Sequence, residues 1–328
     1  MYSATDNFLR GEIPAVITKF TLNLADEIVR IAGEYWNTTT RFRRLCMYNG
    51  LLWLCLFSVG LITISGMKIA VVTGSNKGIG LEITKGLLSQ GHRVIMACRN
   101  PDLGKKAASQ CGGEYIGPLD LNDEASVTTF SDKLRGAGIE SFDVLVNCAA
   151  IAFKSKDPTP HADQAEPTLR PNFFNTVLLT NSLLPMLSES ARIVNVASFA
   201  GGLKIIKDAD RRKQLDEIIS NNDESALKDF ASEFVKDTAA GAHKEKGWPG
   251  TCYGFSKLCL IAYTKILAQK QPQLIVNCVC PGWCATDMSS HSGPRSAAKG
   301  AETPIYLASS EEIKTSGGFY QDLAEMQW

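Results

Sequence analysis

The stretch that decides the fold is KIAVVTGSNKGIG, residues 68–80. Residues 68–73 read as an apolar strand, and a helix is expected from about Ile79 to Ser89. Glycines in the loop between them permit a tight turn and let backbone N–H groups approach a pyrophosphate, which then faces the positive end of the following helix. The order strand, loop, helix therefore predicts a dinucleotide site. Its predicted contacts are Gly74, Asn76, Lys77, Gly78, Ile79 and Gly80.

Beyond this loop, short β-branched runs alternate with helical stretches. After residues 68–73, the predicted strands are 93–98, 114–119, 143–148, 192–197 and 274–280. Such alternation is typical of a parallel sheet covered by helices on both faces, with right-handed crossovers and a ligand beyond the carboxyl ends of the strands. The sequence thus predicts an α/β fold with a doubly wound, Rossmann-like parallel sheet.

One segment interrupts this alternation between the fifth strand and the helix after Gly250. Residues 203–247 are rich in charged residues and alanine, with helical stretches near 208–219 and 225–237. A structureless loop of that length is uncommon in a compact domain. We therefore expect a helical insertion beside the mouth of the site.

The end of the second strand indicates which nicotinamide cofactor is bound. An acidic residue there would hold a free ribose 2′-hydroxyl, whereas a basic residue suits a 2′-phosphate. This chain has Arg99 at that point and Lys77 in the glycine loop, which favours NADPH over NADH. Asp120, at the end of the third strand, is expected near the adenine, and Asn147, in the fourth, is also predicted to contact the cofactor.

A tyrosine and a lysine one helical turn apart form the candidate catalytic pair. Tyr253 and Lys257 lie four residues apart, on one face of the predicted helix after Gly250. A nearby ammonium is expected to lower the pKa of the phenol and prepare it for proton exchange near neutral pH. Ser198 closes the fifth strand and Asn172 lies in a helix after the fourth. All four side chains should therefore reach the edge of the sheet where the glycine loop opens.

At this point residues 68–328 resemble the short-chain dehydrogenase/reductase family and, within it, the monomeric NADPH-dependent carbonyl reductases. The segments that carry the resemblance are TGSNKGIG (73–80), DVLVNCAAIAFKSKDPTP (143–160), PNFFNT (171–176), RIVNVASFAG (192–201), HKEKGWPG (243–250), YGFSK (253–257), CPGWCATDM (280–288) and GAETPIYLA (300–308). They are spread over nearly all of this part of the chain.

The resemblance implies a reaction and a role for each site residue. Hydride passes from the nicotinamide to a ketone or aldehyde carbon, and Tyr253 protonates the oxygen as general acid. Lys257 lowers the pKa of that tyrosine and binds the nicotinamide ribose, Ser198 polarises the carbonyl, and Asn172 holds a water that leads to Lys257. The implied carboxamide contacts are Pro281, Gly282 and Thr286, and the implied walls of an apolar substrate pocket are Trp283 and Met288.

Two positions depart from the family pattern. The fourth strand ends in Asn147-Cys148-Ala149-Ala150 where the family has N-N-A-G, which places a Cβ near the cofactor. Asn175 stands where a small glycine is expected. All four catalytic residue types are nevertheless present, so we expect an active enzyme.

The amino-acid composition limits the kinds of molecule that the protein is expected to bind. The 328 residues include 34 basic and 34 acidic side chains, and this zero net charge argues against a nucleic-acid binder. Ten cysteines and four histidines show no metal-ligand spacing, so no metal site is expected, and reduced thiols in a cytoplasmic protein are favoured. The expected partner is a small carbonyl compound. The insertion resembles one that covers a dimerisation face in related carbonyl reductases, which implies a monomer.

Residues 1–66 differ from the remainder and are predicted to be an N-terminal extension to a reductase domain at 67–328. Residues 45–66 are uncharged and long enough to cross a bilayer, so they are a candidate membrane segment. The extension is an anchor, a targeting segment, or an upstream translation absent from a functional protein that starts at Met67. Two other functions stay open: a membrane-anchored steroid- or retinoid-type dehydrogenase, and a non-catalytic NADP-binding sensor.

Overall fold

The computed structural model describes residues 66–154 and 156–328. The predicted extension, with its candidate membrane segment, lies outside the described residues except for Gly66. Within the described ranges, no helix combines the length and apolar character needed to cross a bilayer. Residues 68–328 form one compact unit.

The described part of the chain forms one eight-stranded sheet, in the order β3-β2-β1-β4-β5-β6-β7-β8. The strands are β1 (Ile69–Thr73), β2 (Arg93–Ala97), β3 (Glu114–Tyr115), β4 (Phe142–Asn147), β5 (Leu187–Val196), β6 (Ile275–Val279), β7 (Phe319–Gln321) and β8 (Ala324–Met326). All neighbours pair in parallel except β7 and β8, which form an antiparallel hairpin. The chain order reverses between β1 and β4, and a crevice forms at such a switch point.

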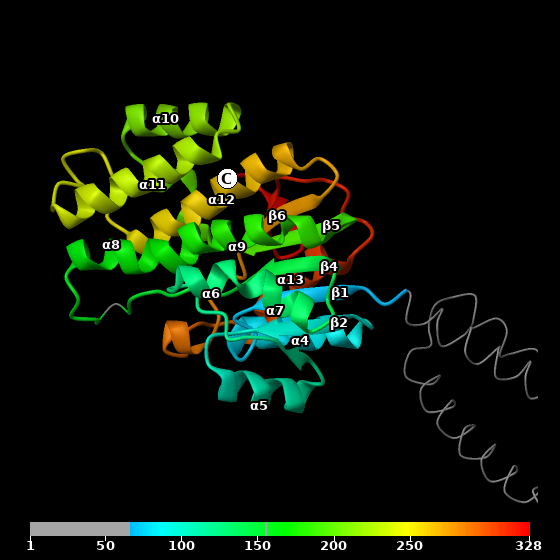
Figure 1. The fold of residues 1–328 in the computed structure, drawn as a ribbon. Coiled ribbons are helices and arrows are strands. Elements are labelled where there is room, and N and C mark those ends of the chain that lie inside the picture. The colour runs from blue at the N-terminus through cyan, green and yellow to red at the C-terminus, as the bar shows by residue number, and fades with distance from the viewer. Residues whose placement is uncertain (1–65, 155) are drawn as a thin grey trace, which may run out of the picture. The chain divides into compact units, whose positions relative to one another are not determined.

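Helices cover both faces of the sheet (Figure 1). On one face lie α6 (Glu124–Thr128), α7 (Phe130–Gly136), α8 (His161–Leu169), α9 (Asn175–Leu183) and α12 (Cys252–Lys270). On the other lie α4 (Gly78–Ser89), α5 (Pro101–Cys111) and α13 (Ala297–Ser309). This arrangement confirms the predicted doubly wound α/β fold.

Alternate residues of the central strands are buried on opposite faces of the sheet. Val71 and Leu145 pack with α9 and α12, whereas Val72 and Val146 pack with α4 and α13. Side chains alternate along a strand, so burial on both faces requires a continuous apolar run, which these strands have.

Two strands differ from their predicted bounds by more than one residue at an end. Strand β3 spans two residues where 114–119 was expected, although the amide of Leu119 still donates to the carbonyl of Cys98 over 3.1 Å. Pro118 has no amide hydrogen and interrupts the regular ladder. Strand β5 begins five residues earlier than expected, and the hairpin of β7 and β8 was not anticipated.

The insertion folds into the two helices α10 (Ala209–Ser220) and α11 (Glu224–Ala239). Asp208 and Asp223 cap them, since each carboxylate accepts a backbone N–H of the first turn over 2.9 Å. Both helices contact α12, and α11 also contacts α8 (Figure 1). The insertion therefore covers the outer side of the helix that carries Tyr253 and Lys257.

Candidate active site

A cleft of about 690 Å³ opens at the carboxyl ends of the parallel strands. It is lined by the loops after β1, β2, β3, β4 and β6, by the end of β5 and by the start of α12. Predicted residues among its lining are Gly74, Asn76, Lys77, Gly78, Ile79, Gly80, Arg99, Asp120, Tyr253, Lys257, Pro281, Thr286 and Met288. The structure thus brings residues that lie between Thr73 and His291 in the sequence together in one cleft.

The glycine loop leaves no room for side chains at two positions. A Cβ at Gly80 would lie 2.3 Å from the carbonyl oxygen of Gly74, and Gly74 itself has φ +66 and would bring a Cβ 2.9 Å from Cα of Ala149. The hydroxyl of Thr73 ties this loop to the turn after β4, because it accepts the amides of Cys148 and Ala149 over 3.0 Å each. The start of α4, whose first backbone amides have no partner within the helix, lies in the cleft lining, as anion binding requires.

The adenosine end of the cleft holds Arg99 and Asp120. Arg99 is exposed at the end of β2, and the Asp120 carboxylate accepts the Asn122 amide over 3.0 Å. Lys77 has a partner that the sequence did not reveal: its Nζ lies 2.7 Å from Oδ2 of Asp287. Oδ1 of the same carboxylate lies 3.0 Å from Nε2 of His291. Asp287 and His291 also line the cleft, so the glycine loop and the loop after β6 face each other across it.

Tyr253 and Lys257 lie in the first two turns of α12 and both line the cleft. Thr251 starts this helix, because its hydroxyl accepts the amide of Gly254 over 3.1 Å. Nζ of Lys257 lies 5.8 Å from the ring centroid of Tyr253 and donates to the carbonyl of Val196 over 2.8 Å. The end of β5 therefore sets the position of the buried ammonium.

Burial dominates the proton affinities of this pair. It raises the pKa of Tyr253 to about 12, and a hydrogen bond with Ser198 opposes that change. It also lowers the pKa of Lys257 from its ordinary 10.5 to about 8. We expected the pKa of Tyr253 to be lowered, but its net shift is upward, because loss of solvent disfavours the charged forms of both residues. At neutral pH the phenol carries its proton.

Ser198 and Asn172 lie beside the pair, but both side chains have structural partners. The hydroxyl of Ser198 accepts the amide of Ala200 over 3.1 Å. Asn172 is buried in a π-helical turn (Arg170–Phe174) before α9. Its side chain exchanges two 2.8 Å hydrogen bonds with the backbone of Ile151 and donates to Ser256 over 3.1 Å. The Asn172 side chain therefore joins the segment after β4 to α12.

Five predicted site residues are absent from the cleft lining: Ser198, Asn172, Asn147, Gly282 and Trp283. Asn147 is buried, and its amide donates to Thr180 over 2.9 Å and to Asn195 over 2.8 Å, between the sheet and α9. Trp283 is 62% exposed on the loop after β6, and the neighbouring Gly282 is covered by the side chain of Arg295. The prediction that Asn147 contacts the cofactor therefore conflicts with its position, since its polar atoms are directed into the protein interior.

The residues present fit NADPH. The glycine loop offers a cradle that a Cβ would fill, Arg99 supplies a cation where a 2′-phosphate is expected, and the lining continues without a break to Tyr253 and Lys257. The glycine departure at the end of β4 places Ala150 in this lining. The other departure, Asn175, is structural, because its amide donates to the carbonyl of Leu121 over 2.8 Å inside the protein.

Comparison with known proteins gives a consistent result. The family model described as short chain dehydrogenase matches residues 68–209. Carbonyl reductase [NADPH] 3 of Mus musculus is 38% identical over 252 residues, which cover 74% of this chain and 90% of that protein. Carbonyl reductase [NADPH] 1 of Homo sapiens is 38% identical over 258 residues, with 74% and 91% covered.

Solved structures show the same architecture. Salutaridine reductase from Papaver somniferum superposes with a TM-score of 0.69 at 31% identity, covering 77% of this chain and 99% of that one. Menthone neomenthol reductase from Mentha piperita gives a TM-score of 0.64 at 29% identity, covering 77% and 98%.

Proposed function

The chain belongs to the short chain dehydrogenase family, and from this premise we propose that its cleft binds NADPH and reduces ketones, aldehydes or quinones to alcohols. The protein is an NADPH-dependent oxidoreductase that acts on carbonyl groups. The observation that carries the proposal is the presence of Tyr253, Lys257 and the glycine loop in the lining of one cleft. The family relatives support the same assignment.

The roles of the individual residues follow from their positions. When bound, NADPH supplies the hydride that reduces the carbonyl carbon. Tyr253 holds a proton on its phenol oxygen at neutral pH, because its pKa is raised to about 12, and donates that proton to the carbonyl oxygen. Ser198 hydrogen-bonds with Tyr253, and Lys257 presents an ammonium beside the phenol ring, where it stabilises the phenolate left after proton transfer.

Replacement of Tyr253 tests this mechanism. We expect Tyr253→Phe, in the full-length protein, to lower kcat for the reduction of menadione by at least about a hundredfold, because the general acid is lost. NADPH oxidation followed by absorbance gives the rate, and fluorescence titration checks that NADPH still binds.

Tyr263→Phe is the matched control. It makes the same change on the same helix, but the hydroxyl of Tyr263 donates to Asn181 inside the protein, away from the cleft. Its turnover should stay close to that of the native protein. Native turnover in Tyr253→Phe would refute the assignment of the general acid.

We further propose that residues 67–328 constitute the reductase domain and that it functions as a cytoplasmic monomer. Among the described residues eight cysteines are free thiols, which suits a reducing compartment. The contacts of α10 and α11 with α12 leave less of that helix for a partner subunit. Light scattering of the purified protein and fractionation of tagged full-length protein test the two statements.

A further inference from the structure

The loop Gly282–Pro294, which follows β6, forms one side of the cleft and has little regular structure. Ala285, Thr286, Asp287, Met288 and His291 line the cleft from this loop. Its regular part is the 3-10 turn Asp287–Ser289, and it is followed by two residues with left-handed φ, 51° at Ser290 and 58° at His291. Its position must therefore be set by contacts with its surroundings.

Arg295 closes the base of this loop. Its carbonyl accepts the amide of Ala285 over 2.7 Å, and its own amide donates to the carbonyl of Trp283 over 3.3 Å. Its side chain then passes directly over Gly282, where a Cβ would lie 2.8–3.0 Å from the Cδ, Nε and Cζ atoms. Gly282 also has φ +77. Glycine at this position thus permits both the turn and the close approach of the arginine.

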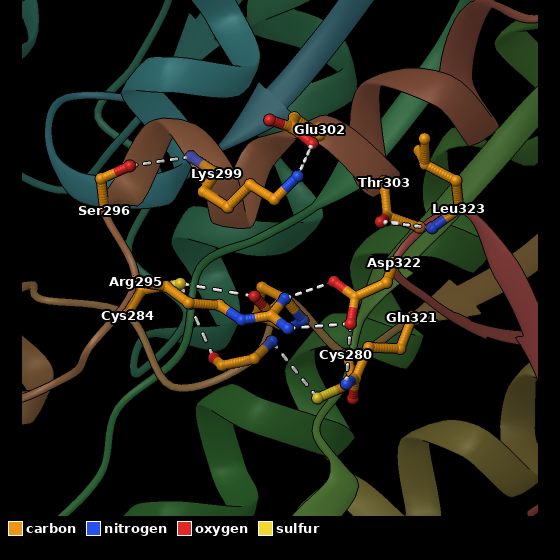
Figure 2. A network of polar contacts seen from close by, with 12 residues as sticks. Cys280, Cys284, Arg295, Ser296, Lys299, Glu302, Thr303, Gln321, Asp322 and Leu323 are labelled. Carbon is orange, nitrogen blue, oxygen red and sulfur yellow. Dashed lines mark hydrogen bonds and ion pairs between the residues drawn. The ribbon is translucent and has the colours of Figure 1, made fainter.

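The guanidinium of Arg295 joins the loop to the C-terminal hairpin (Figure 2). It forms a two-pronged ion pair with Asp322, in which Nη1 contacts Oδ1 and Nη2 donates to Oδ2 over 2.8 Å. Paired hydrogen bonds of this kind fix the orientation of both groups as well as their distance. The ion pair keeps the pKa of Asp322 at about 2.

The turn between β7 and β8 has two residues, and tight turns of this length between antiparallel strands commonly require positive φ at both. Asp322 and Leu323 have φ of 52° and 65°, in the left-handed region that a leucine rarely adopts. The amide of Leu323 donates to the hydroxyl of Thr303 over 3.1 Å, which holds the turn against α13 (Figure 2). Glycine could adopt these φ angles without strain. Other residues keep such angles where surrounding contacts hold the backbone in place.

We propose that Arg295 and Asp322 are positioning residues that hold the loop Gly282–Pro294 against the C-terminal hairpin, and so set the places of Thr286 and Met288 at the nicotinamide end of the cleft. This inference rests on the proposed function of the cleft. Both side chains are partly exposed, 29% for Arg295 and 48% for Asp322, so the ion pair contributes little to global stability. Its effect should be on the loop.

Variants that remove one partner test the inference. We expect Arg295→Met and Asp322→Asn each to raise the KM for menadione about tenfold through misplacement of the loop, while kcat changes less than about threefold. The KM of the double variant should be no higher than that of either single variant, because both changes remove the same contact. Arg295→Lys, which keeps the charge but not the planar fork, should restore part of the affinity.

Arg135→Met is the control, since Arg135 forms an exposed ion pair with Asp132 on α7, outside the cleft lining. Its KM should equal that of the native protein. An unchanged KM in Asp322→Asn would overturn the proposal, whether or not the thermal midpoint of the variant falls.

Hydrogen exchange of the loop provides a measurement that does not depend on turnover. Amides of residues 283–293 should exchange faster in Asp322→Asn than in the native protein or in Arg135→Met, because the side contact of the loop is lost. If the native protein reduces no carbonyl, the proposed function fails. The exchange data would still show whether the Arg295–Asp322 ion pair holds the loop. Identical exchange in Asp322→Asn and native protein would refute it.

Discussion

Two buried cations lie against strand β5, one at its middle and one at its carboxyl end, and they are held in different ways. In the middle of the strand, Arg192 donates to the carbonyl of Leu307 over 3.0 Å and to that of Ile313 over 3.3 Å. At its carboxyl end, Lys257 donates to the carbonyl of Val196 over 2.8 Å. The exposed fractions are similar, 7% for Arg192 and 3% for Lys257. Burial lowers the pKa of both, although a carboxylate, Glu311, partly offsets the effect at Arg192.

The difference separates a structural cation from a catalytic one. An arginine stays charged at any physiological pH, and Arg192 satisfies two acceptors near the end of α13, where the helix carbonyls lack donors. Lys257 lies in the cleft lining and has a pKa of about 8, so a small change in its surroundings can change its protonation near neutral pH. The ammonium at the carboxyl end of β5 therefore carries a stability cost that its function explains, whereas Arg192 in the middle of the strand does not.

The largest effect is expected at the catalytic cation. Lys257→Met should lower turnover by more than about a hundredfold, since the ammonium that stabilises the phenolate is lost. The same variant should be more stable than the native protein, because removing the buried ammonium outweighs the loss of one donor to the Val196 carbonyl. Steady-state kinetics and denaturant unfolding measure the two quantities.

The pH dependence of that gain follows from the pKa of Lys257. The folded state lowers the pKa from 10.5 to about 8, so the destabilisation is fully present below pH 8 and disappears as the pH rises through 10.5. The increase in the free energy of unfolding caused by Lys257→Met should thus be up to about 3 kcal/mol at pH 7 and much smaller at pH 10.5. A gain independent of pH would contradict the assigned cause.

A smaller effect of opposite sign is expected at the structural cation. Arg192→Met should lower the free energy of unfolding by about 2–4 kcal/mol, because two buried carbonyls lose their donors. Turnover per folded molecule should stay near native. Arg93→Met is the control at the amino end of β2, where the arginine forms a partly exposed ion pair with Glu114, and should cost less than about 1 kcal/mol. Equal losses in the two variants would show that Arg192 has no special role.

The smallest effect concerns Glu311, the carboxylate that partly offsets the lowering of the Arg192 pKa. Glu311 is exposed, and Glu311→Gln should reduce stability by less than about 0.5 kcal/mol at low salt and by nothing measurable at high salt. Unfolding curves at two ionic strengths measure this change. A larger loss that persists at high salt would mean that Glu311 makes a direct contact, and would remove the contrast with Lys257.

Local patterns predicted the sheet and most of the site. The apolar runs at 93–98 and 143–148 became β2 (93–97) and β4 (142–147), because strands buried on both faces must be apolar throughout. The glycine loop, Arg99, Tyr253 and Lys257 reached one cleft because the carboxyl ends of parallel strands meet at one edge.

Partners far apart in the chain were not predictable. Lys77 pairs with Asp287 across 210 residues, and no local pattern marks Asp287 as the recipient. Asn147 carries the residue type of a cofactor contact, but Thr180 and Asn195 lie close enough to take its hydrogen bonds. An aspartate or an asparagine has many possible partners, and only the packing selects one.

The amino-acid sequence by itself determined the order of the first six strands and of the helices between them, the position of the glycine loop and the residue types gathered at the cleft, because periodicity and backbone freedom are local properties. The tertiary structure alone decided the proton affinities of Tyr253 and Lys257, and it joined Arg295 to Asp322. Loss of solvent and the choice of a distant partner depend on how separate segments pack against one another, and no single segment encodes them.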